Sequence, residues 1–118
     1  MRMMLALALA LTASSALADE VGDAHKLASQ GRDSYWNCLA GEYSRPEAKG
    51  MSVQDFAADI AIACPSERQN FRVRLLDYLS LQFPSTDTGV HLTTVNPAIA
   101  TAEKDVMTAF LRRKGATN

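Results

Sequence analysis

Cys38 and Cys64 are the two cysteines of the sequence, and their chemistry is the easiest to predict. A thiol pair can form a disulfide, act as a redox centre, or supply two thiolate ligands to a metal. Redox centres normally use C-x-x-C spacing, whereas these cysteines lie 26 positions apart. A zinc site needs two further ligands, which His25 and His91 would supply only by coincidence. We therefore predict a structural disulfide and no metal site.

Nucleophilic or acid–base catalysis has little support in the sequence. Neither histidine belongs to an H-E-x-x-H or H-x3–5-H arrangement, and there is no G-x-S-x-G elbow, phosphate-binding loop or C-x-x-C-H haem motif. Asp55 and Asp59 lie four residues apart, which is typical of a helix cap and a solvated face. We predict no catalytic residue and no cofactor. The remaining alternative is a small enzyme that uses His91 in an 84–96 loop with carboxylates such as Asp87.

The aromatic residues beside Cys38 indicate a binding surface. Tyr35, Trp36, Cys38 and Leu39 cannot share one narrow helical face. Either their helix is buried over a wide arc, with Trp36 covering the disulfide or the loop, or Trp36 belongs to an exposed aromatic patch. We take Tyr35, Trp36 and His91 as the possible binding surface, for a protein partner or for self-association.

The first eighteen residues, MRMMLALALALTASSALA, have the order of a secretory signal peptide. One basic residue, Arg2, precedes a short apolar run, and an A-x-A site ends at Ala18. As a helix, the apolar run would rise about 14 Å, against roughly 30 Å for a hydrocarbon core. We predict cleavage after Ala18, a periplasmic or secreted protein, and no stable membrane anchor after cleavage.

Residues 19–118 then form one predicted domain with a mildly acidic balance. Removing Arg2 from the 12 Lys and Arg leaves eleven against 13 Asp and Glu, a formal charge of −2. The charges are spread evenly, and the basic run Arg112–Lys114 suits the last turn of a helix. Without a basic stripe to release counterions, nucleic-acid binding is not expected.

The hydrophobic pattern predicts an all-α bundle of about four helices. A first helix over 24–43 ends before Pro46, and a second begins at the N-cap Ser52 and runs to Cys64. A bond between Cys38 and Cys64 would staple these two helices as an antiparallel hairpin. A third helix covers 66–83. The β-branched segment 84–96 reads as an ordered surface loop, and Asn96-Pro97 as the cap and first turn of a fourth helix.

Two segments resemble those that carry the disulfide in HdeA-type periplasmic acid-stress chaperones. They are Ser34-Tyr35-Trp36-Asn37-Cys38 and the run from Ala63 to Phe71, ACPSERQNF. The resemblance implies a small exported helical protein with one disulfide. It also implies a dimer that opens at low pH and shields unfolded clients with apolar surface. At low pH the domain would carry eleven Lys and Arg and 2 His, and self-repulsion would loosen it.

The sequence thus favours an exported helical protein that binds a protein or small ligand without catalysis. The acid-activated chaperone is the alternative implied by the resemblance. We expect a flat apolar patch around Trp36 if the protein binds a partner. A pocket with His91 turned inward would instead support the enzyme.

Overall fold

The computed structural model describes the backbone of residues 4–116 and the side chains of residues 16–115. These residues form four α-helices and one short 3-10 helix, with no strand among them: α1 Met4–Ser44, η1 Pro46–Gly50, α2 Val53–Ile62, α3 Pro65–Gln82 and α4 Thr88–Ala116. The predicted all-α class is confirmed. The predicted signal peptide, 1–18, lies mostly outside the described side chains, and its backbone from Met4 onward continues α1 without a break.

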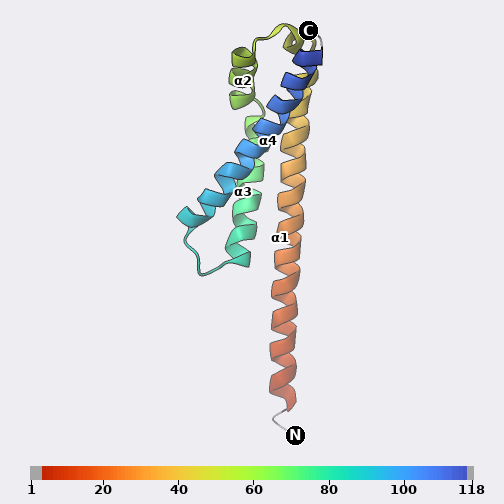
Figure 1. Cartoon of the computed structure of the whole chain (residues 1–118). Helices are drawn as coiled ribbons and strands as arrows, with labels where there is room; N and C mark the ends of the chain where they lie inside the picture. The colour runs from red at the N-terminus through yellow and green to blue at the C-terminus, as the bar shows by residue number, and fades with distance from the viewer. Residues whose placement is uncertain (1–3, 117–118) are drawn as a thin grey trace.

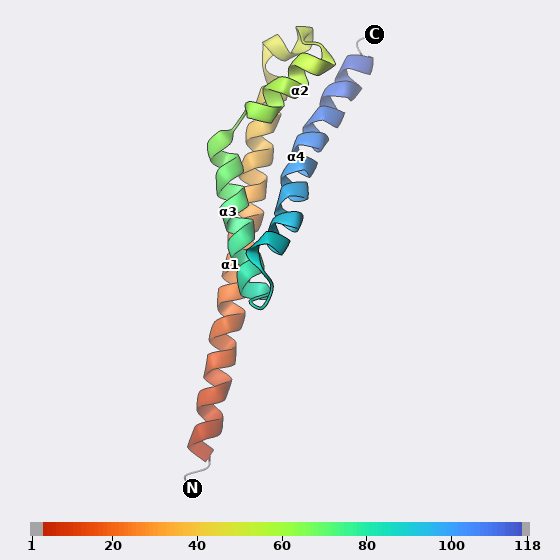
Figure 2. The ribbon, with the colours of Figure 1, turned by 90° about the vertical axis from the view of Figure 1, so that its left-hand side faces the viewer.

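The molecule is elongated, with extents of 79 × 24 × 22 Å. α1 runs its whole length, α2 and α3 return alongside it, and α4 climbs back toward the end where α1 stops (Figure 1). The N-terminal part of α1 projects beyond the other helices in both views (Figure 2). The bundle therefore has two unlike ends: a lower end at the α3–α4 turn, and an upper end where η1 and α2 meet the end of α4.

α1 and α3 pack closely because a glycine lies between them. A Cβ atom added to Gly31 would lie 3.2 Å from the Cα atom of Phe71. The missing side chain lets the two backbones approach, which offsets the intrinsic cost of glycine in a helix. Around this contact, Tyr35 and Leu39 of α1 are completely buried. α1 ends at Ser44, one residue after the predicted end, because Pro46 follows, whereas it begins at Met4 and not at the predicted residue 24.

The bend between α2 and α3 carries the disulfide. The Oγ atom of Ser52 accepts a hydrogen bond from the Asp55 backbone N–H at 3.1 Å, so the predicted N-cap of α2 is confirmed. Cys64 has left-handed backbone angles, φ 56° and ψ 49°, directly before α3. The predicted Cys38–Cys64 bond is present. It staples α1 to the start of α3, so the helix paired with α1 is α3 and not α2.

The segment predicted as a loop over 84–96 is helical from Thr88 onward. Pro97 lies inside α4 and does not begin it, and Asn96 is not its cap. The Asn96 Oδ1 atom instead accepts a hydrogen bond from Arg72 Nη1 at 2.8 Å. Pro97 removes one backbone donor, but packing compensates, because an unbroken buried stripe crosses this point. The stripe consists of His91, Val95, Ile99, Ala102, Val106 and Phe110.

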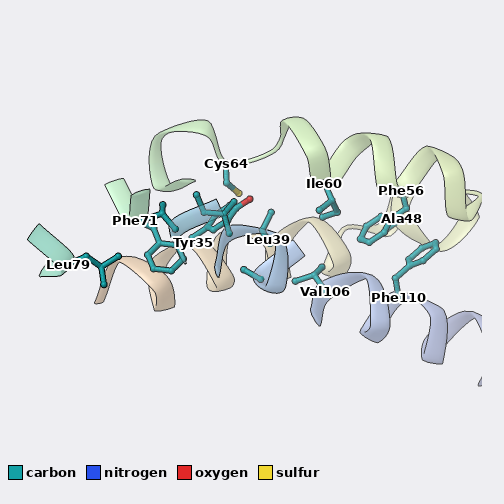
Figure 3. Packing of buried hydrophobic residues seen from close by; sticks show 13 residues of the cluster. Tyr35, Leu39, Ala48, Phe56, Ile60, Cys64, Phe71, Leu79, Val106 and Phe110 are labelled. Atoms are coloured by element: carbon teal, nitrogen blue, oxygen red, sulfur yellow. The ribbon is translucent and has the colours of Figure 1, made fainter. Parts of the chain in front are cut away.

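From Val95 to Phe110 the stripe belongs to one buried cluster with residues of the other helices, part of which Figure 3 shows from close by. Helical spacing predicts that Ile99, Ala102, Val106, Met107 and Phe110 face inward; this is confirmed, with Met107 partly buried and the others buried. At the upper end, Phe56 stacks on Phe110 with ring centroids 4.1 Å apart and an interplanar angle of 11°. For α2, helical spacing predicts an inner face of Val53, Phe56, Ala57, Ile60, Ala61 and Cys64. Phe56 and Ile60 are the buried residues of α2, whereas Ala57 and Ala61 are exposed, so the prediction is wrong for these two.

Candidate functional site

A polar cluster from three helices lies beside the disulfide. The Tyr35 hydroxyl of α1 donates a hydrogen bond to Glu103 Oε1 of α4 at 3.0 Å. Burial raises the pKa of Tyr35 to about 12; Glu103 adds to this rise, and the Arg68 guanidinium of α3 opposes it. The side chain of Tyr35 has no exposed surface. The cluster therefore fixes the register of three helices and gives a substrate no access to this hydroxyl.

Arg68 closes the bend between α2 and α3. Its Nη2 atom donates to the Ala63 carbonyl at 2.9 Å, at the C-cap of α2. Its Nε atom is buried without a hydrogen-bond partner. A guanidinium has five N–H donors, so one donor without a partner costs little stability when another donates to a carbonyl and the charge lies beside the Tyr35 hydroxyl. Arg68 thus supports the fold beside the disulfide.

Glu67 and the two disulfide sulfur atoms form a cluster that resembles a metal site in its spacing. Its carboxylate oxygen and the sulfur atoms of Cys38 and Cys64 lie within 4.8 Å of one another. Metals bind thiolates, whereas these two sulfurs are bonded to each other. In the oxidised protein this group therefore offers a single carboxylate, which is too few ligands for a structural zinc site.

The structure does not bring the three predicted surface residues together. Tyr35 is 0% exposed, His91 is 4% exposed, and Trp36 is 42% exposed. Adjacent residues on a helix point about 100° apart, so burying Tyr35 turns Trp36 outward. Tyr35 and His91 belong to the core, and the expected aromatic patch is reduced to one tryptophan.

The structure places His91 differently from what the enzyme alternative predicts. It lies in the first turns of α4, and not in a loop, and its Nε2 atom is buried with no hydrogen-bond partner. Its link to Asp87 is the helical hydrogen bond from the His91 N–H to the Asp87 carbonyl, at 3.2 Å. The imidazole begins the buried stripe of α4. Core packing accounts for this position.

Trp36 lies on the same face of α1 as His25, Ser29 and Arg32, because these residues are spaced four, three and four apart. Beside the first three of these positions is a cavity of about 200 Å³. Its floor includes Phe71 and Leu75, and His25 meets Tyr78 edge-on at 5.1 Å. The cavity is smaller than typical ligand sites, which span about 300–1,000 Å³.

A larger hollow lies between α1 and α3 at the lower end, and we call it the α1–α3 groove. Its volume is about 470 Å³, and it is lined by Glu20, Asp23, Ala24, Leu27, Arg74, Asp77, Ser80 and Leu81. Leu27 and Leu81 are 41% and 40% exposed. Helical spacing over 24–43 predicts that Leu27 faces the core together with Tyr35 and Leu39, and this is wrong for Leu27. All of these residues follow Ala18, so the groove belongs to the predicted domain.

Sequence reasoning missed this groove because no single segment contains it. Asp77 and Leu81 lie four residues apart, as do Asp23 and Leu27, so each helix carries one matching acidic and apolar pair. Repeated pairs of this kind are a weak signal. Only the packing of α3 against α1 makes them into one surface.

Two carboxyl groups, Glu42 near the end of α1 and Asp59 in the second half of α2, lie close together. Burial raises the pKa of Glu42, and hydrogen bonding with and repulsion by Asp59 raise it further, while Arg45 opposes the rise. Arg45 Nη1 lies 2.6 Å from Glu42 Oε2. A carboxyl pair on two helices makes their contact pH-dependent.

The comparisons with known proteins give no match: no family model, no curated protein and no solved structure is similar to the chain. Among the helices the structure describes, none combines the length and apolarity needed to cross a membrane.

Proposed function

We propose that the chain is an exported helical protein that binds a partner without catalysis, and that the α1–α3 groove is its binding site. The observation that carries the proposal is the open apolar floor of this groove, where Leu27 and Leu81 are both about two-fifths exposed. Phe83 and Val90 are exposed at the same end of the bundle. Leu27 and Leu81 line one hollow, and contiguous exposed apolar surface is typical of docking surfaces.

The charges of the groove favour a basic amphipathic helix as the bound segment. Glu20, Asp23 and Asp77 surround the apolar floor, against the single cation Arg74. A helix laid between α1 and α3 would place its apolar face on Leu27 and Leu81 and its cations beside the carboxylates. Complementary charge would set the orientation and the association rate more than the affinity.

Export is supported by the leader-like residues 1–18 and by the disulfide, since disulfides persist in oxidising compartments. We place the protein in the periplasm or outside the cell. Fractionation of the native cells, with N-terminal sequencing of the recovered protein, tests this. A chain recovered from the cytoplasm and beginning at Met1 would contradict it.

The groove is tested with two synthetic helical peptides that share one leucine face and differ only in having lysine or glutamate on the other face. We expect the lysine peptide to bind about tenfold more tightly, and the variant Asp23→Lys with Asp77→Lys to reverse this preference. The matched control is Asp33→Lys with Asp105→Lys, two exposed positions outside the groove lining. An equal loss of affinity for the lysine peptide in both variants would show that only the net charge of the protein matters.

A photo-crosslinking residue locates the bound peptide. We expect a crosslink from position Leu81, in the groove, and none from Leu111, which is exposed on α4 at the upper end. Sedimentation without peptide tests the competing occupant, a second copy of the chain. A stable dimer that Asp23→Lys with Asp77→Lys disrupts would assign the groove to self-association.

The acid-activated chaperone implied by the HdeA resemblance is our second proposal. It is favoured by the single disulfide in an all-helical chain and by the apolar residues at the lower end. The two proposals predict binding at different pH values. The groove is open as the structure stands, so partner binding should occur at neutral pH, whereas the chaperone should suppress client aggregation only after acidification to about pH 2. Client protection absent at both pH values would remove the second proposal.

A further inference from the structure

Arg74 of α3 lies at the junction of two hollows. It lines the α1–α3 groove, and it also lines an open hollow farther along α3, which we call the polar hollow. The polar hollow has a volume of about 620 Å³, and its other lining residues carry no charge: Pro65, Ser66, Gln69, Asn70 and Val73. Among the described residues that line the two hollows, Arg74 is therefore the only cation.

The two hollows lie along one face of α3. Four residues of α3 are spaced four, three and four apart and so share this face: Asn70, Arg74, Asp77 and Leu81. A Cβ atom added to Gly31 would lie 3.4 Å from the Asn70 amide nitrogen, so Asn70 reaches the contact between α1 and α3. A helix lying in the groove and continuing along α3 would therefore meet Leu81, then Asp77, then Arg74.

The Arg74 guanidinium has no salt bridge and no hydrogen bond to any residue that the structure describes. The three carboxylates of the α1–α3 groove line the same hollow, but none of them lies within salt-bridge distance of Arg74. The Arg74 side chain is partly buried, so salt and water would screen a pair formed there less than a pair on the open surface. Arg74 is thus available to an anion that a partner brings.

We propose that the helix bound in the α1–α3 groove carries an acidic residue that pairs with Arg74. The inference rests on the proposed function, because it describes the same bound helix. Asp77 lies four residues from Leu81 and Arg74 lies seven, which correspond to about 6 Å and about 10 Å along the helix axis. A partner helix lying alongside α3 would therefore present a leucine, a cation four residues away and an anion seven residues away.

This order of charges makes Arg74 a specificity-determining residue. A uniformly basic helix satisfies Asp77 but brings a cation against Arg74. A helix with its acid and its base exchanged meets like charges at both positions, which disfavours the wrong partner more than it strengthens the right one. The groove would therefore distinguish among basic amphipathic helices by where their single acidic residue lies.

The test compares two helical peptides that have the same composition and the same leucine face. The ordered peptide has lysine four residues and glutamate seven residues from the leucine that meets Leu81, and the exchanged peptide has these two residues swapped. Fluorescence anisotropy with the full disulfide-bonded protein measures both affinities. We expect the ordered peptide to bind about tenfold more tightly, and added salt to reduce the difference.

Arg74→Glu should remove this preference, because each peptide then meets one like charge, the ordered peptide at position 74 and the exchanged peptide at Asp77. The matched control is Arg112→Glu, with the same charge change at an exposed position of α4 that lines neither hollow, and it should keep the preference. A preference that persists in Arg74→Glu would overturn the proposal.

The wild-type measurements separate this proposal from the proposed function. Equal affinities for the ordered and exchanged peptides, with binding of the all-lysine peptide intact, would overturn the pairing with Arg74 and leave the groove as the binding site. Absence of binding by all three peptides would overturn both proposals.

Discussion

The helices pack by different means at the two ends of the bundle, and each end has a different surface. At the lower end, Gly31 brings the backbones of α1 and α3 together, so little side-chain volume lies between them. The α1–α3 groove beside that contact stays open, with three carboxylates among its lining residues. At the upper end, Phe56 and Phe110 fill the gap between α2 and α4 with two stacked rings. The hollow left there is smaller and is surrounded by cations.

Close backbone packing and aromatic packing therefore make the fold sensitive to different substitutions. A helix pair joined through glycine tolerates change along its open groove but not at the glycine. An end filled by two aromatic rings depends on both rings, because no other large side chain of α2 except Ile60 is buried. Substitutions at Phe56 and at Gly31 test the two ends separately.

Phe56→Ala should have the largest effect. Removing the ring leaves a cavity against Phe110 and should lower the free energy of unfolding by about 3–5 kcal/mol. The loss should be local, so hydrogen exchange should accelerate in α2 and in the second half of α4 before it accelerates in α3. Chemical denaturation and amide exchange measure the two quantities. Equal acceleration throughout α3 would show that the ends unfold as one unit.

Cys38→Ser with Cys64→Ser should be nearly as costly. The bond closes a loop with a sequence separation of 26, worth about 3–4 kcal/mol in the chain-entropy model. Because the bond lies at the junction of the two ends, its loss should weaken both. Thermal melting of the oxidised protein, the reduced protein and the double variant measures the effect. An unchanged melting temperature in all three would contradict it.

The sequence predicted those parts of the fold that depend on one segment at a time. The buried stripe of α4 from Ile99 to Phe110 and the Ser52 cap follow from residue spacing and local hydrogen bonding. The helix over 88–96 was missed because its β-branched residues and Asn96-Pro97 favour other structures locally. Burial of His91 and Val95 against the rest of the bundle outweighs that preference.

The α1–α3 groove was missed for the same reason. It combines residues from two elements far apart in sequence, 20–27 with 74–81. Trp36 and Tyr35 were grouped because they are adjacent, yet adjacency on a helix separates side chains. Charge and apolarity in the sequence therefore indicated that surfaces exist, and only tertiary packing shows which residues share one.

Gly31→Ala and Gly41→Ala should have opposite effects. At Gly31 the new methyl group would meet the Phe71 Cα atom at 3.2 Å, and that backbone is fixed by the buried Phe71 ring. We expect a loss of about 1 kcal/mol, because the cost of overpacking exceeds the gain in helix propensity. At Gly41 no atom lies within 4 Å, so the helix propensity of alanine should give a gain of up to about 1 kcal/mol. Urea denaturation compares them, and a gain at both positions would remove close packing as the role of Gly31.

Glu42→Gln should have the smallest effect and an informative pH dependence. The pKa of Glu42 is raised in the folded state, by burial first and then by Asp59. A raised folded-state pKa means that the stabilising contribution is complete below the unfolded pKa and is lost as pH rises through the folded pKa. Glutamine keeps a hydrogen-bonding group and never carries the charge. Its melting temperature should therefore exceed the wild-type value slightly at about pH 7, with the gap closing toward about pH 3.

Glu47→Gln is the matched control for this prediction, because Glu47 also lies beside Arg45, at 3.6 Å, whereas Asp59 acts on Glu42. Glutamine at position 42 also loses the Arg45 ion pair, which is worth little because the Arg45 side chain is 47% exposed. A melting temperature that rises for the Glu42 variant and not for the Glu47 variant assigns the effect to the contact between α1 and α2. That contact would then tighten as the pH falls, so an acid-driven opening of the molecule would have to begin at the lower end, where the α1–α3 groove lies.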